Sequence, residues 1–157
     1  MGSHYAGTET ELRALNAYIK LARAADSVNA RTTRHLAGAG LTASQFGVLE
    51  ALHHLGPLAQ SRLAAKHLMS RGNMTTVVEN LEKRGLVRRE RDARDRRGVT
   101  VRLLPAGEAL LLQVLARHVA GIVADLSVLT PDEQDELGRL CRKLGKQDRE
   151  PDGGTPR

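Results

Sequence analysis

The chain of 157 residues is poor in aromatic and sulfur-containing side chains. It has no tryptophan, two tyrosines and one phenylalanine, and its one cysteine is Cys141. A core therefore has to be built from leucine, valine and alanine, a composition that favours helices. A single cysteine excludes an intrachain disulfide and fits a reducing compartment. The sequence predicts a mainly α protein of the cytoplasm.

Motifs that carry chemistry are also scarce. No glycine-rich phosphate loop and no nucleophile–base–orienter set can be found, so neither an enzyme nor a cofactor is expected. His53, His54 and His67 have no accompanying acid-rich cluster, and neighbouring histidines on a helix point about 100° apart, so no metal site is expected. Charged residues interrupt the apolar stretch 105–126, which predicts no membrane span. No signal peptide or internal repeat is visible.

Positive charge is present, and it is concentrated. Residues 60–102 hold 12 Lys/Arg and five Asp/Glu, a net charge of +7, whereas the whole chain has +6. The rest of the chain therefore sums to −1. A basic face confined to one segment is the electrostatic footprint of a nucleic-acid-binding surface.

The basic segment begins with a polar helix. Ser70 is a suitable N-cap, the pattern predicts a helix from Arg71 to Arg84, and Gly85 supplies the positive φ wanted at its end. One face is apolar, with Met74, Val77, Val78 and Leu81. Small hydrogen-bonding groups and a cation lie opposite, namely Gly72, Asn73, Thr76, Asn80 and Lys83. Such a face can enter a major groove, although an ordinary surface helix carries the same pattern.

A charged hairpin follows this helix. Residues 86–91 and 99–103 contain valines alternating with polar residues, as half-buried strands do. In the turn 92–98, two acids stand among three arginines, and Asp95 is expected to hold one arginine by a bidentate pair. Arg96 or Arg97 at the loop tip suits insertion into a minor groove. A polar helix followed by such a loop predicts a winged helix.

At this point the sequence resembles the MarR-type bacterial transcription regulators. The resemblance rests on the residues 80–92 (NLEKRGLVRRERD), the wing tip Asp95-Arg96-Arg97, the stretch 101–107 (VRLLPAG) and, upstream, 41–49 (LTASQFGVL). One departure is Leu104, where the family usually has a helix-capping threonine, and Pro105 at the first helical position partly compensates. The resemblance implies a homodimer and a small phenolic or aromatic effector bound between the dimerisation helices and the winged domain.

Four segments are expected. They are an N-terminal dimerisation helix in 5–40 (about Thr10 to Leu36), a winged helix-turn-helix domain in 41–104, C-terminal dimerisation helices in 105–145 and a disordered tail in 146–157. The first four residues resemble a tag remnant. Thr42 and Gln45 predict a capping box, 58–60 a third strand, and 61–68 the first helix of the helix-turn-helix. Thr130 to Glu133 predicts the start of the last helix.

The flanking helices carry more apolar surface than a small winged domain can cover. Burying that surplus calls for a homodimer, and a two-fold dimer reads two half-sites about one helical turn apart on double-stranded DNA. The operator should therefore be a near-palindrome.

Particular residues are assigned to each part of the interface. Asn73, Thr75, Thr76 and Asn80 are expected to read bases, with Gly72 allowing close approach. Arg71, Lys83, Arg62 and Ser61 are expected to hold phosphates, and Arg96 and Arg97 to enter the minor groove; Ser70, Arg94 and Asp95 complete the predicted set. Tyr18, His35 and His53 are the candidate effector contacts.

The predicted function is that of a sequence-specific repressor released from its operator by a small effector. Two alternatives stay open. A non-specific architectural DNA-binding protein would share the basic face. A redox-responsive regulator could use Cys141, which stands among Arg139, Arg142 and Lys143, a basic setting typical of reactive cysteines. The plainer interpretation makes Cys141 a small residue near the dimer interface.

Overall fold

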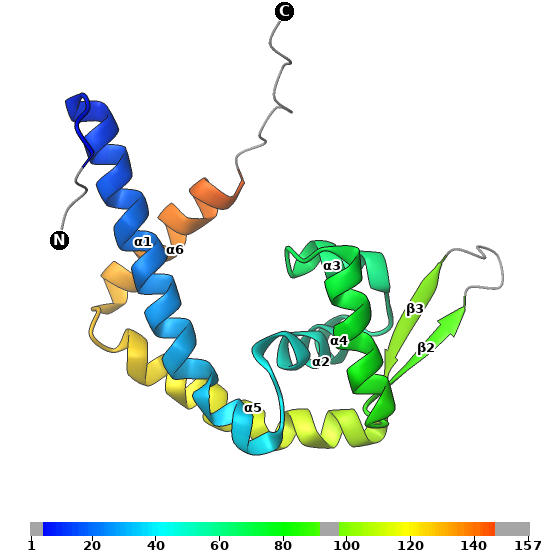
Figure 1. Cartoon of the computed structure of the whole chain (residues 1–157). Coiled ribbons are helices and arrows are strands. Elements are labelled where there is room, and N and C mark those ends of the chain that lie inside the picture. The colour runs from blue at the N-terminus through cyan, green and yellow to red at the C-terminus, as the bar shows by residue number, and fades with distance from the viewer. Residues whose placement is uncertain (1–4, 92–97, 147–157) are drawn as a thin grey trace, which may run out of the picture. The chain divides into compact units, whose positions relative to one another are not determined.

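The computed structural model describes residues 5–91 and 98–146 (Figure 1). The elements in chain order are α1 (Glu9–Thr33), the 3-10 helix η1 (Arg34–Ala39), α2 (Ala43–Leu55), β1 (Leu58–Ala59), α3 (Gln60–Lys66), α4 (Arg71–Lys83), β2 (Val87–Arg91), β3 (Val99–Leu103), α5 (Pro105–Leu126) and α6 (Pro131–Gly145). The antiparallel sheet has the order β1-β3-β2. The prediction of a mainly α winged helix is confirmed. The chain divides into two compact units, 1–122 and 123–157.

Two predicted capping boxes are confirmed. At the start of α2, the Gln45 N–H donates to Thr42 Oγ1 (3.1 Å), and the Thr42 N–H donates to Gln45 Oε1 (3.0 Å). Thr130 and Glu133 make the same reciprocal pair at the start of α6. Each box satisfies backbone N–H groups that have no partner inside the helix, which fixes where the helix begins.

The first long helix ends earlier than predicted. The α-helical part stops at Thr33, and the chain continues as η1 to Ala39. The hydroxyl groups of Thr32 and Thr33 donate back to the carbonyls of Val28 (2.9 Å) and Asn29 (2.6 Å). Such local bonds compete with the regular helical ladder near its end, which the apolar spacing could not indicate.

The helix-turn-helix is α3, a turn and α4. The helix α3 covers Gln60–Lys66, shorter than the predicted 61–68, because Leu68 takes the left-handed conformation with φ of 51°. The Leu68 N–H donates to Ala65 O (3.2 Å) and the Met69 N–H to Ala64 O (2.9 Å), as in a helix-ending Schellman motif. The N-cap Ser70 and the positive φ of Gly85 (68°) at the end of α4 are confirmed.

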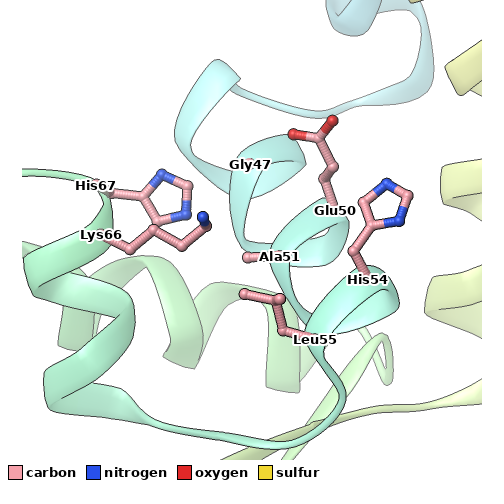
Figure 2. Close-up of a pocket in the computed structure, with 7 residues that line it drawn as sticks. All are labelled: Gly47, Glu50, Ala51, His54, Leu55, Lys66 and His67. Carbon is pink, nitrogen blue, oxygen red and sulfur yellow. The ribbon is translucent and has the colours of Figure 1, made fainter. Parts of the chain in front are cut away.

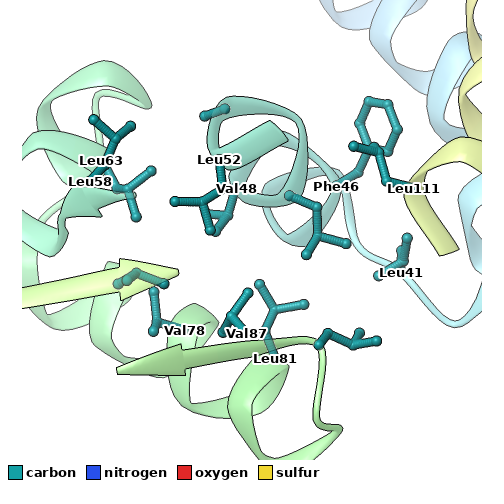
Figure 3. Packing of buried hydrophobic residues seen from close by; sticks show 14 of the residues in the cluster. Leu41, Phe46, Val48, Leu52, Leu58, Leu63, Val78, Leu81, Val87 and Leu111 are labelled. Atoms are coloured by element: carbon teal, nitrogen blue, oxygen red, sulfur yellow. The ribbon is translucent and has the colours of Figure 1, made fainter. Parts of the chain in front are cut away.

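One apolar core holds the winged domain together. Side chains from α2, α3, α4, the sheet and the start of α5 meet in it, and Figure 3 shows Phe46, Val48, Leu81 and Leu111 among them. Phe46 is the single Phe, Tyr or Trp residue of this core, in agreement with the low aromatic content of the sequence. A Cβ on Gly107 would lie 2.2 Å from the Leu86 carbonyl oxygen, so glycine lets α5 begin tight against the domain.

The helix α5 departs from one expectation. By length and composition it could cross a membrane, with a mean hydropathy of 1.6 over its most apolar stretch and 11% of that stretch buried, and it is the one helix of the described residues for which this holds. Charged residues are few enough in that stretch for its mean hydropathy to stay high. In α6, no residue is buried, and Leu137, Leu140 and Leu144 are 41–55% exposed.

Candidate nucleic-acid interface

The helix α4 presents three stripes of side chains. Met74, Val78 and Leu81 are fully buried and form the inner stripe, which anchors the helix to the core. Thr76, Asn80 and Lys83 are exposed and form the outer stripe. The remaining stripe, Thr75, Glu79 and Glu82, is half-buried and lies between the other two. The predicted division into an apolar face and a polar face is therefore confirmed, with a third stripe that the sequence pattern did not distinguish.

The N-terminal end of α4 is open. Arg71, Gly72 and Asn73 are exposed, and a Cβ built on Gly72 would meet no heavy atom within 4 Å. The space around Gly72 is therefore open, and close approach of DNA there stays a prediction. The Ser70 hydroxyl accepts from the Asn73 N–H (3.2 Å), so its first role is to cap the helix. On α3, Ser61 and Arg62 are exposed.

Thr75 is not directed outward as predicted. Its hydroxyl donates to the Arg71 carbonyl (2.9 Å) and accepts from Gln60 Nε2 (2.8 Å) on α3. Thr75 was assigned to base reading together with Thr76, and the spacing could not show that Gln60 stands across from it. The structure gives Thr75 a role in joining α3 and α4, and base reading by Thr75 stays a prediction.

The strands of the wing carry arginines with two different surroundings. Arg88 and Arg102 face each other in the register of β2 and β3 and are exposed. Arg89 points to the other side, where it contacts Glu82 and Glu79 of α4. The N–H of Arg89 keeps the pKa of the Glu82 carboxyl below its usual value, against the opposing effect of burial. The predicted wing-tip residues Arg94, Asp95, Arg96 and Arg97 lie outside the described residues.

One contact between distant segments was not predicted. The guanidinium of Arg84, just after α4, donates to the carbonyls of Gly40 (2.6 Å) and Ala39 (3.4 Å) at the end of η1. Those carbonyls belong to a helix end, which lacks partners of its own. In the sequence, Arg84 is a cation just past the end of a helix. Nothing about that position indicates a partner more than 40 residues away.

The three candidate effector residues do not meet in one pocket. Tyr18 is 67% exposed on α1, and His53 Nδ1 lies 3.2 Å from a Glu108 carboxylate oxygen. His35 lines a cavity of about 410 Å³ whose walls include Gln113 and Arg117 of α5. Burial lowers the pKa of His35, and the nearby His118 and Arg117 lower it further. His35 Nε2 is buried and has no hydrogen-bond partner among the described residues.

A second cavity, of about 260 Å³, lies between α2 and the end of α3 (Figure 2). Its walls include His54 and Glu50 from α2, Lys66 at the end of α3 and His67 just after it. Among residues 5–91 and 98–146, no group of three or more His, Cys, Asp or Glu side chains is arranged to hold a metal ion. Cys141 is exposed on α6.

Comparison with known proteins agrees with this arrangement. The model of the MarR family matches residues 41–99. The HTH-type transcriptional regulator YkoM of Bacillus subtilis is 36% identical over 133 residues, which are 85% of this chain and 86% of YkoM. A probable transcriptional regulator from Pseudomonas aeruginosa shares the fold with a TM-score of 0.72 and 34% identity, over 80% of this chain and 94% of that one.

A structure determined with DNA is also similar. Sco3205, a MarR family transcriptional regulator from Streptomyces coelicolor in complex with DNA, has a TM-score of 0.80 and 26% identity, covering 92% of this chain and 91% of its own. The chain belongs to the MarR family and is a DNA-binding transcriptional regulator with a winged helix-turn-helix.

Proposed function

We propose that the protein is a homodimeric repressor that binds a near-palindromic operator and leaves it when a small acidic aromatic compound binds. The observation that carries the proposal is the outer stripe of α4. Thr76 and Asn80 offer hydroxyl and amide groups to base edges, and Lys83 offers a cation to phosphate, with the backbone at Gly72 open to contact. Arg71 and Asn73 extend this surface at the start of the helix, and Ser61 and Arg62 at α3.

The apolar surface outside the winged domain supports a dimer. Several large apolar side chains of α5 and α6 are 41–63% exposed, namely Leu112, Val119, Val123, Leu137, Leu140 and Leu144. Full burial of such a side chain is worth roughly 1.5–3 kcal/mol, and covering the exposed half of each would add about half of that. The composition of α5 would also allow it to cross a membrane. Contact with a partner helix in a cytoplasmic dimer explains that composition equally well.

The cavity beside His35 is the proposed effector site. Arg117 supplies a cation that suits a phenolate or carboxylate, and His35 lines the same cavity. Leu110 and Val114 supply the apolar walls for a ring. A similar protein, Bordetella bronchiseptica BpsR (28% identity, TM-score 0.76, 83% of this chain and 98% of that one), has its DNA binding regulated by 6-hydroxynicotinic acid.

Selection from random duplexes tests the operator. The parent protein should enrich one site with two half-sites about one helical turn apart. Equal recovery of all sequences would instead identify an architectural DNA-binding protein.

Binding of benzoic acid and 6-hydroxynicotinic acid, measured by calorimetry, tests the effector site. Arg117→Ala should abolish it while leaving duplex binding without effector unchanged, and a variant that still binds both acids would exclude this cavity.

A further inference from the structure

Arg89 occupies a position in β2 where an apolar side chain is expected. Residues alternate along a strand, and Val87 faces the core with 1% exposure, Arg88 is exposed, and Arg89 returns to the core side. Its neighbour across the sheet is Val101, which is completely buried. A charge on the inner face is costly unless it is paired, so Arg89 needs partners within the domain.

The partners come from α4. Arg89 Nε donates to Glu82 Oε2 (2.7 Å), Nη1 donates to Glu79 Oε1 (3.2 Å), and the backbone N–H of Arg89 donates to Glu82 Oε1 (2.7 Å). The strand β2 is an edge of the sheet, where backbone groups lack a neighbouring strand. Glu82 therefore holds the main chain and the side chain of one residue, and it joins α4 to the wing.

These glutamates belong to the half-buried stripe of α4. Thr75, Glu79 and Glu82 follow a spacing of four and three residues, which puts them on one line along the helix. Thr75 at one end is held by Gln60 of α3, and Glu82 at the other end is held by Arg89 of β2. The helix is thus tied to both of its neighbours along a single line.

This line lies next to the outer stripe on the helix surface. Thr76, Asn80 and Lys83 each come one residue after Thr75, Glu79 and Glu82, so each lies about 100° further round the helix. Any rotation of α4 about its axis that breaks the contacts of Arg89 also turns the outer stripe. Contacts to base edges need distances of about 2.7–3.2 Å, so a small rotation is enough to lose them.

We propose that Arg89 is a positioning residue for DNA recognition, which sets the rotation of α4 through Glu79 and Glu82 and makes no contact with phosphate. The proposal rests on the proposed function, in which the outer stripe reads bases. Two carboxylates contact the guanidinium of Arg89, whereas Arg88 is exposed and acts on Glu82 through its charge. The two neighbouring arginines thus have different roles.

The experiment compares Arg89→Gln with Arg88→Gln, because each removes one positive charge from the same strand. Duplex pools of about 30 bp give the selected sequence, and one mixed-sequence duplex gives the salt dependence of non-specific binding. For Arg89→Gln, preference for the parent's selected site over the mixed duplex should fall at least about tenfold, the loss of one charge-assisted hydrogen bond. The salt slope should stay that of the parent, and Arg88→Gln should keep the parent's selected sequence.

Two outcomes would overturn the proposal. One is an Arg89→Gln variant that selects the parent's sequence with the parent's preference. The other is a fall of about 0.9 in its salt slope, which marks a lost phosphate contact. Arg89→Lys separates charge from geometry, since lysine keeps the charge but not the fork, and it should lose preference as the glutamine variant does. If Arg89→Lys kept the parent's full preference for the selected site, that result would contradict a positioning role for Arg89.

A measurement without DNA tests the contact itself. In Glu82→Ala, the amide of Arg89 should exchange its hydrogen at least about tenfold faster, because its acceptor is gone. The amides of Val78 and Leu81 should keep the parent's protection, which shows that the domain stays folded. An unchanged rate at Arg89 would overturn the inference, whereas a parent that binds no duplex would overturn the proposed function and leave the exchange result standing.

Discussion

The helices α4 and α6 share one sequence pattern, and the protein uses them differently. Each starts at a hydroxyl N-cap, Ser70 or Thr130, and each carries apolar side chains at helical spacing. In α4, Met74, Val78 and Leu81 are fully buried within the chain, whereas α6 buries no residue, and Leu140 is 43% exposed. Amphipathic spacing therefore predicts that a face will be covered, but not whether the cover comes from the same chain or from another.

The largest effect should come from the buried face. Leu81→Ala removes a side chain with no exposed surface, and it leaves a cavity in the core. We expect the free energy of unfolding in urea to fall by about 2–5 kcal/mol at every protein concentration. A loss below about 1 kcal/mol would mean that the core around α4 collapses to fill the space.

A charge on the exposed face should act on assembly instead. We expect Leu140→Asp to separate the subunits at micromolar concentration, because each large side chain left uncovered costs roughly 1.5–3 kcal/mol. Sedimentation velocity measures the result, and Arg142→Asp, on another side of α6, is the control that should remain dimeric. A parent protein that already sediments as a monomer would contradict the comparison.

Ion pairs on the two helices should differ in the same way. Bonds from Arg89 and from Arg139 lower the pKa values of Glu82 and Glu136 below the usual 4.5. A carboxyl with a lowered pKa stabilises the folded state above its usual pKa, and that stabilisation is lost as the pH falls through the lowered value. Glu82→Gln should therefore cost about 1–2 kcal/mol at pH 7 and progressively less below about pH 4.

The exposed Glu136 is the matched control for this pH series. Its pair with Arg139 lies in solvent, where such pairs contribute little. Glu136→Gln should follow the parent's stability at every pH in urea titrations. If Glu82→Gln and Glu136→Gln have the same pH dependence of stability, the burial of Glu82 beside β2 adds nothing to the stability that its ion pair provides.

The smallest effect is expected at Leu68, which belongs neither to the buried face of α4 nor to the exposed face of α6. Leu68 is 95% exposed, stands alone and has a φ of 51°. Leu68→Gly relieves about 1–2 kcal/mol of backbone strain and adds about 1 kcal/mol of chain entropy to the unfolded state. A gain of about 0.5 kcal/mol in thermal or urea unfolding is expected. A loss of stability would show that the leucine makes a favourable contact, such as one in the proposed dimer.

The sequence predicted the parts of the fold that depend on local signals. Ser70, Thr42 and Thr130 each marked a helix start correctly, because a cap acts over three or four residues. The strand Val99–Leu103 was predicted to the residue, and the other strand began one residue later than expected. Alternating valines carry that information by themselves.

The features that the sequence did not indicate depend on partners distant in the sequence. Thr75 was assigned to the groove because nothing in the spacing shows Gln60 beside it. Arg89 and Arg88 look equivalent in the sequence, and only the pairing of β2 with β3 shows which of them faces α4. The effector residues were scattered, since a cavity is formed by the packing of several elements. The roles assigned to Asn73, Asn80 and the wing-tip arginines stay predictions.

The contact of Arg84 with Gly40 has a consequence for the order of folding. It joins residues 44 positions apart, so closing it costs more chain entropy than forming any single helix turn. The contact also needs the end of α4 to lie beside the end of η1, so we expect it to form after α4 has packed into the domain. The N-terminal helix should therefore dock late, and loosening this contact should speed unfolding while leaving the rate of folding of the winged domain nearly unchanged.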